Sequence, residues 1–231
     1  MSKETLRDRL RASTRPAHDD LERAVDIDTR IATREGYAGH LLRLWALHSS
    51  IEAALARLDF AALGFLYRGP HRSGLLETDL EIIGIPPAAL SALPLPAAPE
   101  IASIFDGLGC LYVVEGSAKG ARAILPQIKA RLGFEPHFGA SYFYGFGAET
   151  GRLWHAILAA INAIDPQSNE ADRAVTAAAA TFAMLFHAWL VSARLDEAET
   201  DLVRDRGNRL SMVSPSPNPL ERATSAGAVT P

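Results

Sequence analysis

Helical periodicity constrains the fold of this chain more than any other feature of its sequence. Across residues 34–58, apolar side chains recur at steps of three and four, the spacing of one face of an α-helix: Tyr37, Leu41, Leu44, Trp45, Ile51, Leu55 and Leu58. The alternation of apolar and polar residues that indicates strands is almost absent, and turn dipeptides at hairpin spacing are few. The sequence therefore predicts an all-α fold.

Similar patterns and their interruptions divide the rest of the chain. We expect helices at 3–13, 16–26, 34–58, 72–83, 100–132 (with interruptions), 149–164 and 168–196. Proline is typical of a first helical turn, so Pro16 predicts the start of a second helix, separate from the first. Five prolines between positions 86 and 99 predict a loop, because proline disrupts a helix interior. The predicted organisation is one all-α domain over residues 1–211, followed by a disordered Ser/Pro/Ala-rich tail over 212–231.

Composition excludes several classes of protein. The net charge of -4 lacks the basic excess of a nucleic-acid-binding protein. No apolar run reaches the roughly 18 residues of a membrane-spanning helix, and the first residues lack the apolar centre of a signal peptide. Cys110 is the single cysteine, so no internal disulfide can form. We expect a soluble protein of the reducing cytoplasm with no membrane segment and no nucleic-acid partner.

Three glycines in the segment 100–132 share one face of the predicted helix. Gly109, Gly116 and Gly120 fall within about 40° of one another at 100° per residue. Each glycine costs roughly 1 kcal/mol relative to alanine in a helix interior, so the stripe needs a compensating role. That role is either close packing of two helices or the approach of a flat ligand to the backbone.

His18 and Glu22 are four residues apart, and therefore share one face of the second predicted helix. A metal-ligating histidine commonly donates its other ring N–H to a carboxylate, so the pair suits a single axial iron ligand. The alternative is an ordinary solvent-exposed pair on a helix. No other suitably spaced cysteines or histidines favour a structural zinc site.

Two segments carry a resemblance to a known family. The sequences LRASTRPAHDDLE at 10–22 and LGCLYVVEGSAKGARAI at 108–124 resemble the heme oxygenases, supported by FYGFG at 143–147 and TFAMLFHAWL at 181–190. The likeness is greatest to the bacterial branch often associated with phytochromes. It implies a single-domain helical bundle that holds heme between a proximal and a distal helix.

The resemblance also implies roles for individual residues. His18 corresponds to the proximal iron ligand and Glu22 to its partner, while Gly116 and Gly120 correspond to the distal glycines that leave room for dioxygen. Ser117 stands where animal-type members carry an aspartate that organises distal water.

Basic residues and two departures complete the implied site. Arg11 and Arg15 match positions that attract the heme propionates, although a solvated basic face is the alternative. Lys119 and Ala121 depart from the expected Leu-Gly-Gly; Lys119 can extend to solvent, pair with a propionate, or reach the iron side as a neutral amine. His155 is the nearby candidate for a propionate partner in place of an arginine.

The implied reaction opens heme to biliverdin, carbon monoxide and ferrous iron, with heme as both substrate and cofactor. Electrons are expected from a ferredoxin or similar reductase, and a bacteriophytochrome is a possible recipient of the biliverdin. Two rival hypotheses stay open: a non-catalytic heme or bilin carrier or sensor of the same fold, and a helical interaction domain that binds no tetrapyrrole.

Overall fold

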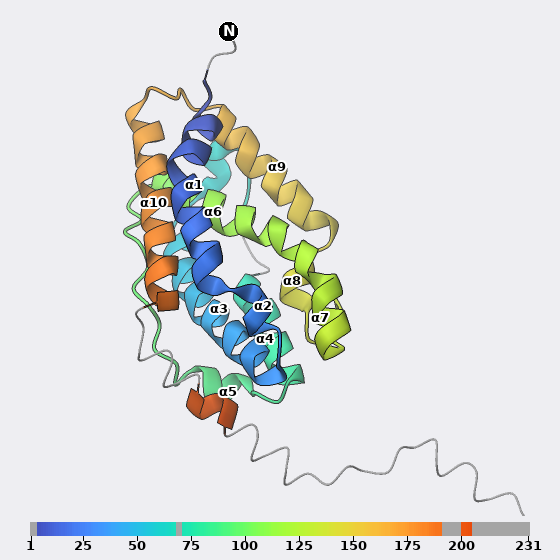
Figure 1. Ribbon diagram of the computed structural model, residues 1–231. Helices are drawn as coiled ribbons and strands as arrows, with labels where there is room; N and C mark the ends of the chain where they lie inside the picture. Colours follow the sequence, from blue (N-terminus) through green and yellow to red (C-terminus); the bar gives the residue numbers. More distant parts are fainter. Residues whose placement is uncertain (1–3, 68–70, 191–199, 205–231) are drawn as a thin grey trace, which may run out of the picture.

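The computed structural model describes residues 4–67, 71–190 and 200–204, and their secondary structure is helical, with only isolated bridges at Glu135 (Figure 1). The main elements are α1 (Leu6–Val25), α2 (Ile27–Arg30), α3 (Arg34–Leu55), α4 (Arg72–Ile82), α5 (Pro87–Leu90), α6 (Ile104–Ala121), α7 (Leu125–Leu132), α8 (Ser141–Tyr144), α9 (Ala148–Asn162) and α10 (Asn169–Leu190). The all-α prediction is confirmed. The part of the predicted last helix beyond residue 190, the domain limit at 211 and the tail at 212–231 lie outside the described residues.

The prediction of two separate helices at 3–13 and 16–26 is wrong. Helix α1 is continuous through Pro16, and begins at a capping box in which Thr5 and Asp8 exchange hydrogen bonds. A proline inside a helix removes one backbone hydrogen bond. Burial offsets that loss, because α1 packs apolar side chains into the core on both sides of Pro16, Leu10 before it and Leu21 after it.

The other boundaries follow local signals. Helix α6 begins at a second capping box, formed by Ser103 and Asp106. It ends in a short 3-10 segment, Arg122–Ile124, and Pro126 lies in the first turn of α7. The predicted interruption of the segment 100–132 is therefore confirmed. Within the loop predicted from the prolines, residues 87–90 form the short helix α5.

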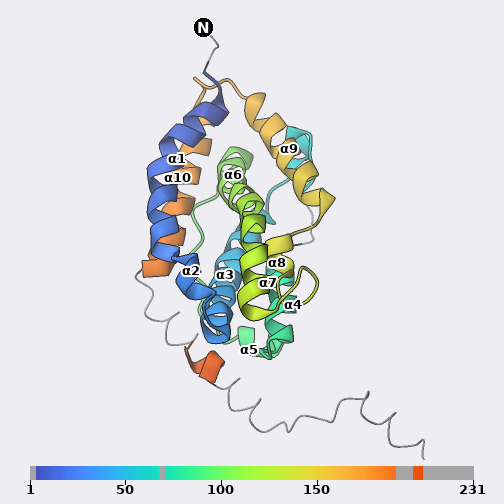
Figure 2. The ribbon, with the colours of Figure 1, turned by 45° about the vertical axis from the view of Figure 1, so that its right-hand side comes forward.

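Helix α6 is the centre of the main core. It packs against α10 and α9, and α1 packs against the same two helices. Figure 2 shows α1 and α10 side by side on one flank of α6, with α9 on the other. A second core lies between α3, α4 and the segment around α8. In this arrangement α1 and α6 face each other, and residues of both helices line the same cavities.

Helix α10 is the one described helix with the length and apolar composition needed to cross a membrane. Its contacts with α1 and α6 give a different reason for that composition. Ala174, Ala178 and Phe182 are buried in the main core. A core helix of this kind needs apolar residues for packing, so its composition is weak evidence of a membrane span.

Candidate functional site

A cleft separates α1 from α6. It consists of two adjoining cavities of about 390 Å³ and 530 Å³, whose linings share His18, Glu22, Gly116 and Ser117. We call the smaller one the arginine-side cavity, because Arg11 and Arg15 line it. The larger one is the apolar-side cavity, lined mainly by Leu21, Val25, Ile27, Leu44, Ala121, Ile124 and Phe143. These volumes are typical of a site for one bound small molecule or cofactor.

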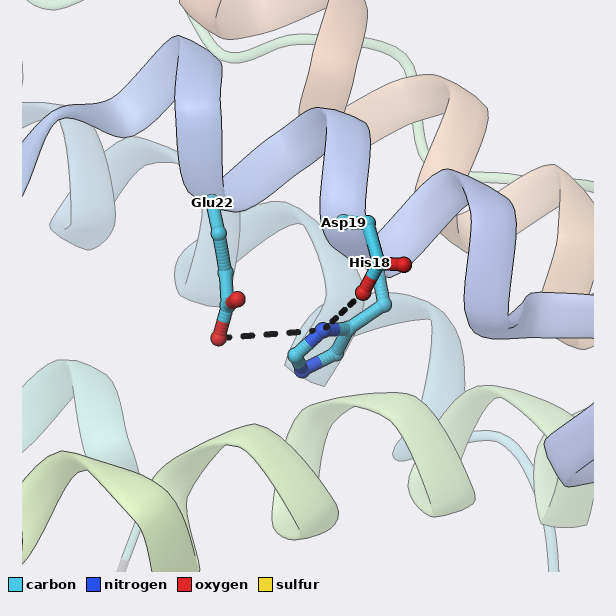
Figure 3. A group of neighbouring side chains, drawn as sticks. All are labelled: His18, Asp19 and Glu22. Carbon is cyan, nitrogen blue, oxygen red and sulfur yellow. Dashed lines mark ion pairs between the residues drawn. The ribbon is translucent and has the colours of Figure 1, made fainter.

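His18 extends from α1 toward α6 into the middle of the cleft (Figure 3). Its Nδ1 lies 3.7 Å from Glu22 Oε1 and 3.9 Å from Asp19 Oδ1. These distances exceed a direct hydrogen bond, so both carboxylates act on the ring through their charge. The imidazole contacts the Phe182 ring edge-on, and 46% of its side chain is exposed. The other ring nitrogen, Nε2, is on the side of the ring that faces α6 (Figure 3).

Asp19 is an addition to the pair predicted from the sequence. The ligand atoms of His18, Asp19 and Glu22 lie within 4.8 Å of one another. Two carboxylates near one imidazole nitrogen favour a proton on Nδ1 and leave Nε2 as a lone-pair donor. The arrangement can therefore present the Nε2 atom of His18 to a metal held in the cleft.

The glycine stripe on α6 divides into two roles. A Cβ atom at Gly109 would lie 2.0 Å from the carbonyl oxygen of Ala174, so this glycine permits the close packing of α6 and α10. A Cβ at Gly116 would lie 3.2 Å from the ring of Trp154, whereas at Gly120 it would meet nothing within 4 Å. Gly116 and Gly120 both line the apolar-side cavity and expose helix backbone to it.

Matched alanine substitutions are expected to separate these two roles. Gly109→Ala places a methyl group against the backbone of α10 at Ala174 and should destabilise the fold by about 1–3 kcal/mol. Gly120→Ala adds a methyl group in open space and should stabilise it by a few tenths to about 1 kcal/mol. Urea unfolding of the two variants checks the opposite signs; equal changes in both would contradict the division of the stripe.

The remaining predicted residues divide between the cleft and the surface. Arg11 and Arg15 line the arginine-side cavity, and Arg15 Nε lies 4.0 Å from Asp19 Oδ2. Ser117 lines both cavities. Lys119 is exposed and belongs to neither lining. His155 is also exposed, and its Nδ1 lies 2.7 Å from the carbonyl oxygen of Gly151 on its own helix. The structure thus brings together seven of the nine predicted site residues.

Trp154, the neighbour of His155, lines the arginine-side cavity from α9. Its ring lies 5.9 Å from the ring of Tyr112, which lines the same cavity from α6. These two rings give the arginine side an aromatic wall that sequence reasoning did not identify. The apolar periodicity of α9 could have identified Trp154, because it places position 154 on the buried face of the helix and position 155 on the exposed face.

The sequence analysis also did not identify a buried polar group formed by Tyr142, His48 and Glu52. Tyr142 lines the apolar-side cavity, and its hydroxyl lies 2.9 Å from His48 Nε2. His48 Nδ1 lies 3.9 Å from Glu52 Oε1, and Glu52 in turn accepts hydrogen bonds from Ser73. Burial lowers the pKa of His48 to about 3 and raises that of Tyr142 to about 12. Both side chains are therefore neutral at pH 7, and each can donate and accept a hydrogen bond.

Next to this group, Arg72 and Glu115 form a buried ion pair. Arg72 Nη2 lies 2.5 Å from Glu115 Oε2, and Arg72 Nε lies 3.1 Å from Oε1. Both side chains are almost completely buried. Because Glu115 directly precedes Gly116, this bidentate pair fixes α6 where its backbone meets the cleft.

Asp79 fixes the position of Tyr142. Its two carboxylate oxygens accept hydrogen bonds of 2.8 Å from the backbone N–H groups of Ser141 and Tyr142. These groups lie in the first turn of α8, where a helix leaves N–H groups without partners. The carboxylate therefore orients the first turn of α8 and places the Tyr142 ring at the cleft.

Comparisons with known proteins give the family and agree with the all-α fold. The heme oxygenase family model matches residues 4–191. The fold is similar to that of the heme oxygenase from Neisseria meningitidis, a protein solved with NO and CO bound, with a TM-score of 0.64 and 20% sequence identity over 86% of this chain and 94% of that one. A search of curated proteins finds no match. Since the family match spans most of the sequence and the solved structure shares the all-α fold, the chain belongs to the heme oxygenase family.

Proposed function

We propose that this protein binds heme in the cleft between α1 and α6 and degrades it, with O2 and external electrons, to biliverdin, carbon monoxide and ferrous iron. One observation supports this above all others. The His18 imidazole, with carboxylates beside its Nδ1, faces a stretch of α6 whose glycines expose backbone. One histidine opposite a helix face that carries glycines suits a flat macrocycle that holds a metal ion.

The other residues of the cleft fit heme as well. Arg11 and Arg15 supply positive charge at one end, where the two propionates need partners. The apolar-side cavity supplies an apolar surface for the methyl and vinyl edge of the ring. When bound, heme supplies the iron and the macrocycle that carry the oxidation, and the protein supplies orientation and hydrogen bonds.

Each cleft residue then has a specific task. His18 Nε2 would ligate the iron of a bound heme, while the charges of Glu22 and Asp19 favour a proton on Nδ1. The Ser117 hydroxyl and the Tyr142 hydroxyl are hydrogen-bonding groups on the opposite wall, where they can hold water. The 2.9 Å contact with His48 fixes the orientation of the Tyr142 hydroxyl. Lys119 and His155 have no task in this scheme, because the structure leaves both outside the cleft linings.

Replacing both arginines should weaken heme binding through loss of the propionate contacts. We expect Arg11→Gln/Arg15→Gln to raise the Kd for hemin about five- to tenfold, and to make it less sensitive to salt. Heme dimethyl ester, which lacks the two negative charges, should bind both proteins alike. Arg131→Gln on α7, an exposed arginine paired with Asp28, is the matched control. Equal weakening for hemin and its ester would contradict the assignment.

A single-turnover absorption experiment tests the proposed function. Purified protein receives one equivalent of hemin, then ascorbate or a ferredoxin system in air. We expect the Soret band to decay while the broad red absorbance of biliverdin grows, with carbon monoxide trapped by deoxymyoglobin. A Soret band that forms and persists would show a heme carrier or sensor of the same fold instead.

The partners belong to the same proposal. A ferredoxin or a similar reductase is the proposed electron donor, and a bacteriophytochrome the proposed recipient of the biliverdin. We also propose a cytoplasmic location, which the single cysteine, Cys110, supports, since it is free and buried.

A further inference from the structure

His40 is a buried imidazole in the wall of the cleft that the proposed function does not use. It projects from α3 and lines the apolar-side cavity, at the end away from Arg11 and Arg15. Only 3% of the residue is exposed, and no hydrogen-bond partner for its Nδ1 is present in the described part of the chain. A buried polar atom without a partner costs about 1–3 kcal/mol, so a ligand group that satisfies it would bind favourably.

The surroundings of His40 hold the ring rigidly and keep it neutral. The imidazole contacts two aromatic rings, with centroids 5.0 Å from Trp189 and 6.1 Å from Phe143. Burial, together with the nearby charges of Arg30 and Arg43, lowers its pKa to about 3. A neutral imidazole offers one N–H donor and one bare nitrogen acceptor. His40 therefore places a neutral imidazole, whose buried Nδ1 has no partner in the described residues, in the wall of an otherwise apolar end of the cleft.

The other polar side chains of this cavity have different assignments. His18, Glu22 and Ser117 lie in the middle of the cleft, in the lining that both cavities share. The hydroxyl of Tyr142 is hydrogen bonded to His48 and has the task of holding water in the proposed function. His40 is thus the polar side chain of this cavity that the proposed function leaves unassigned and whose Nδ1 has no partner among the described residues.

Intact heme has no polar group for this position. Its propionates share one edge of the ring, and the opposite edge carries methyl groups, vinyl groups and a bridging carbon. With the propionates at Arg11 and Arg15, that carbon-only edge lies at the end of the cleft that His40 lines. Loss of the bridging carbon there leaves a terminal lactam on each side of the opening, with a C=O acceptor and an N–H donor.

We propose that His40 recognises the reaction product: its imidazole hydrogen bonds a terminal lactam of the bilin and has no equivalent partner in heme. This inference rests on the proposed function and adds a group that distinguishes product from substrate. The bilin class it favours is the isomer opened opposite the propionates.

The test compares the Kd of purified biliverdin with that of hemin, without turnover. His40→Phe keeps a planar ring beside Trp189 and Phe143 but removes both polar atoms. We expect it to raise the Kd for biliverdin about five- to tenfold and that for hemin less than about twofold. His40→Gln restores a donor and an acceptor and should retain part of the discrimination. His137→Phe, an exposed histidine outside the cleft linings, is the control.

Two results would overturn the inference: an unchanged Kd for biliverdin in His40→Phe, or equal weakening for both ligands. Should that variant fail to fold, the ring 15N resonances of His40 in the wild type provide a second readout. They should shift with biliverdin and change little with gallium protoporphyrin, and a shift with neither would also overturn it. Binding of hemin without turnover contradicts the proposed function instead, and leaves the biliverdin comparison measurable.

Discussion

His18→Ala is expected to abolish heme degradation while leaving a protein that still associates with hemin. Substitution of groups around a metal ligand typically costs 10–100-fold, so loss of the ligand itself should lower the rate by at least about 100-fold. The apolar walls of the cleft remain, so the macrocycle still has surface to bury. Absorption spectra and single-turnover rates of the hemin complex measure both effects.

One rescue and two further variants make this experiment specific to ligation. Added imidazole should restore the histidine-ligated Soret band of His18→Ala, because the substitution leaves a vacant position beside α1. Glu22→Gln should keep the ligand and lower the rate by a smaller factor, about tenfold. His155→Ala, on an exposed histidine of α9, should behave as wild type. A His18→Ala protein with an unchanged spectrum and rate would show that another group holds the iron.

The second large effect concerns stability and the buried Arg72–Glu115 pair. Arg72→Met leaves the Glu115 carboxylate buried without its partner, and should destabilise the fold by about 3–5 kcal/mol. The double variant Arg72→Met/Glu115→Leu removes both charges and should recover most of that loss, because no uncompensated charge remains. Urea unfolding of the single and double variants measures the difference.

The control for this prediction is an ion pair on the surface. Arg152→Met breaks the exposed pair between Arg152 and Glu149, which join at 2.7 Å on α9, and should change stability little or not at all. A double variant as unstable as the single one would mean that Arg72 stabilises through packing, for example against the Phe146 ring, rather than through charge.

Much of the proximal side was predictable because it depends on local spacing. His18 and Glu22 are four residues apart, so any helix that contains both brings them together. The break predicted before Pro16 was wrong because a local rule for proline competes with the burial of Leu10 and Leu21 in the core. Whether a helix continues through a proline depends on tertiary packing, which a local sequence pattern does not contain.

The glycine stripe also shows that local spacing alone does not determine the role of a residue. Spacing placed Gly109, Gly116 and Gly120 on one face and left two explanations open. The packing explanation holds at Gly109, where α10 covers the face, and the ligand explanation stays a prediction at Gly120, where a Cβ atom would meet nothing within 4 Å. Which neighbour covers which turn depends on how the helices are arranged in space.

The opposite wall of the cleft was the least predictable part. His48 and Tyr142 are 94 residues apart in sequence, and Arg72 and Glu115 are 43 apart. Only the fold brings these partners together. Within the sequence, the i and i+4 spacing of His48 and Glu52 on one predicted helix was the available signal.

A structure of the ferric heme complex tests the central claim most directly. We expect a bond between the iron and His18 Nε2, the macrocycle between α1 and the Gly116–Gly120 stretch of α6, and the propionates at Arg11 and Arg15. Heme bound outside this cleft, or ligated by a residue other than His18, would contradict the assignment of the site.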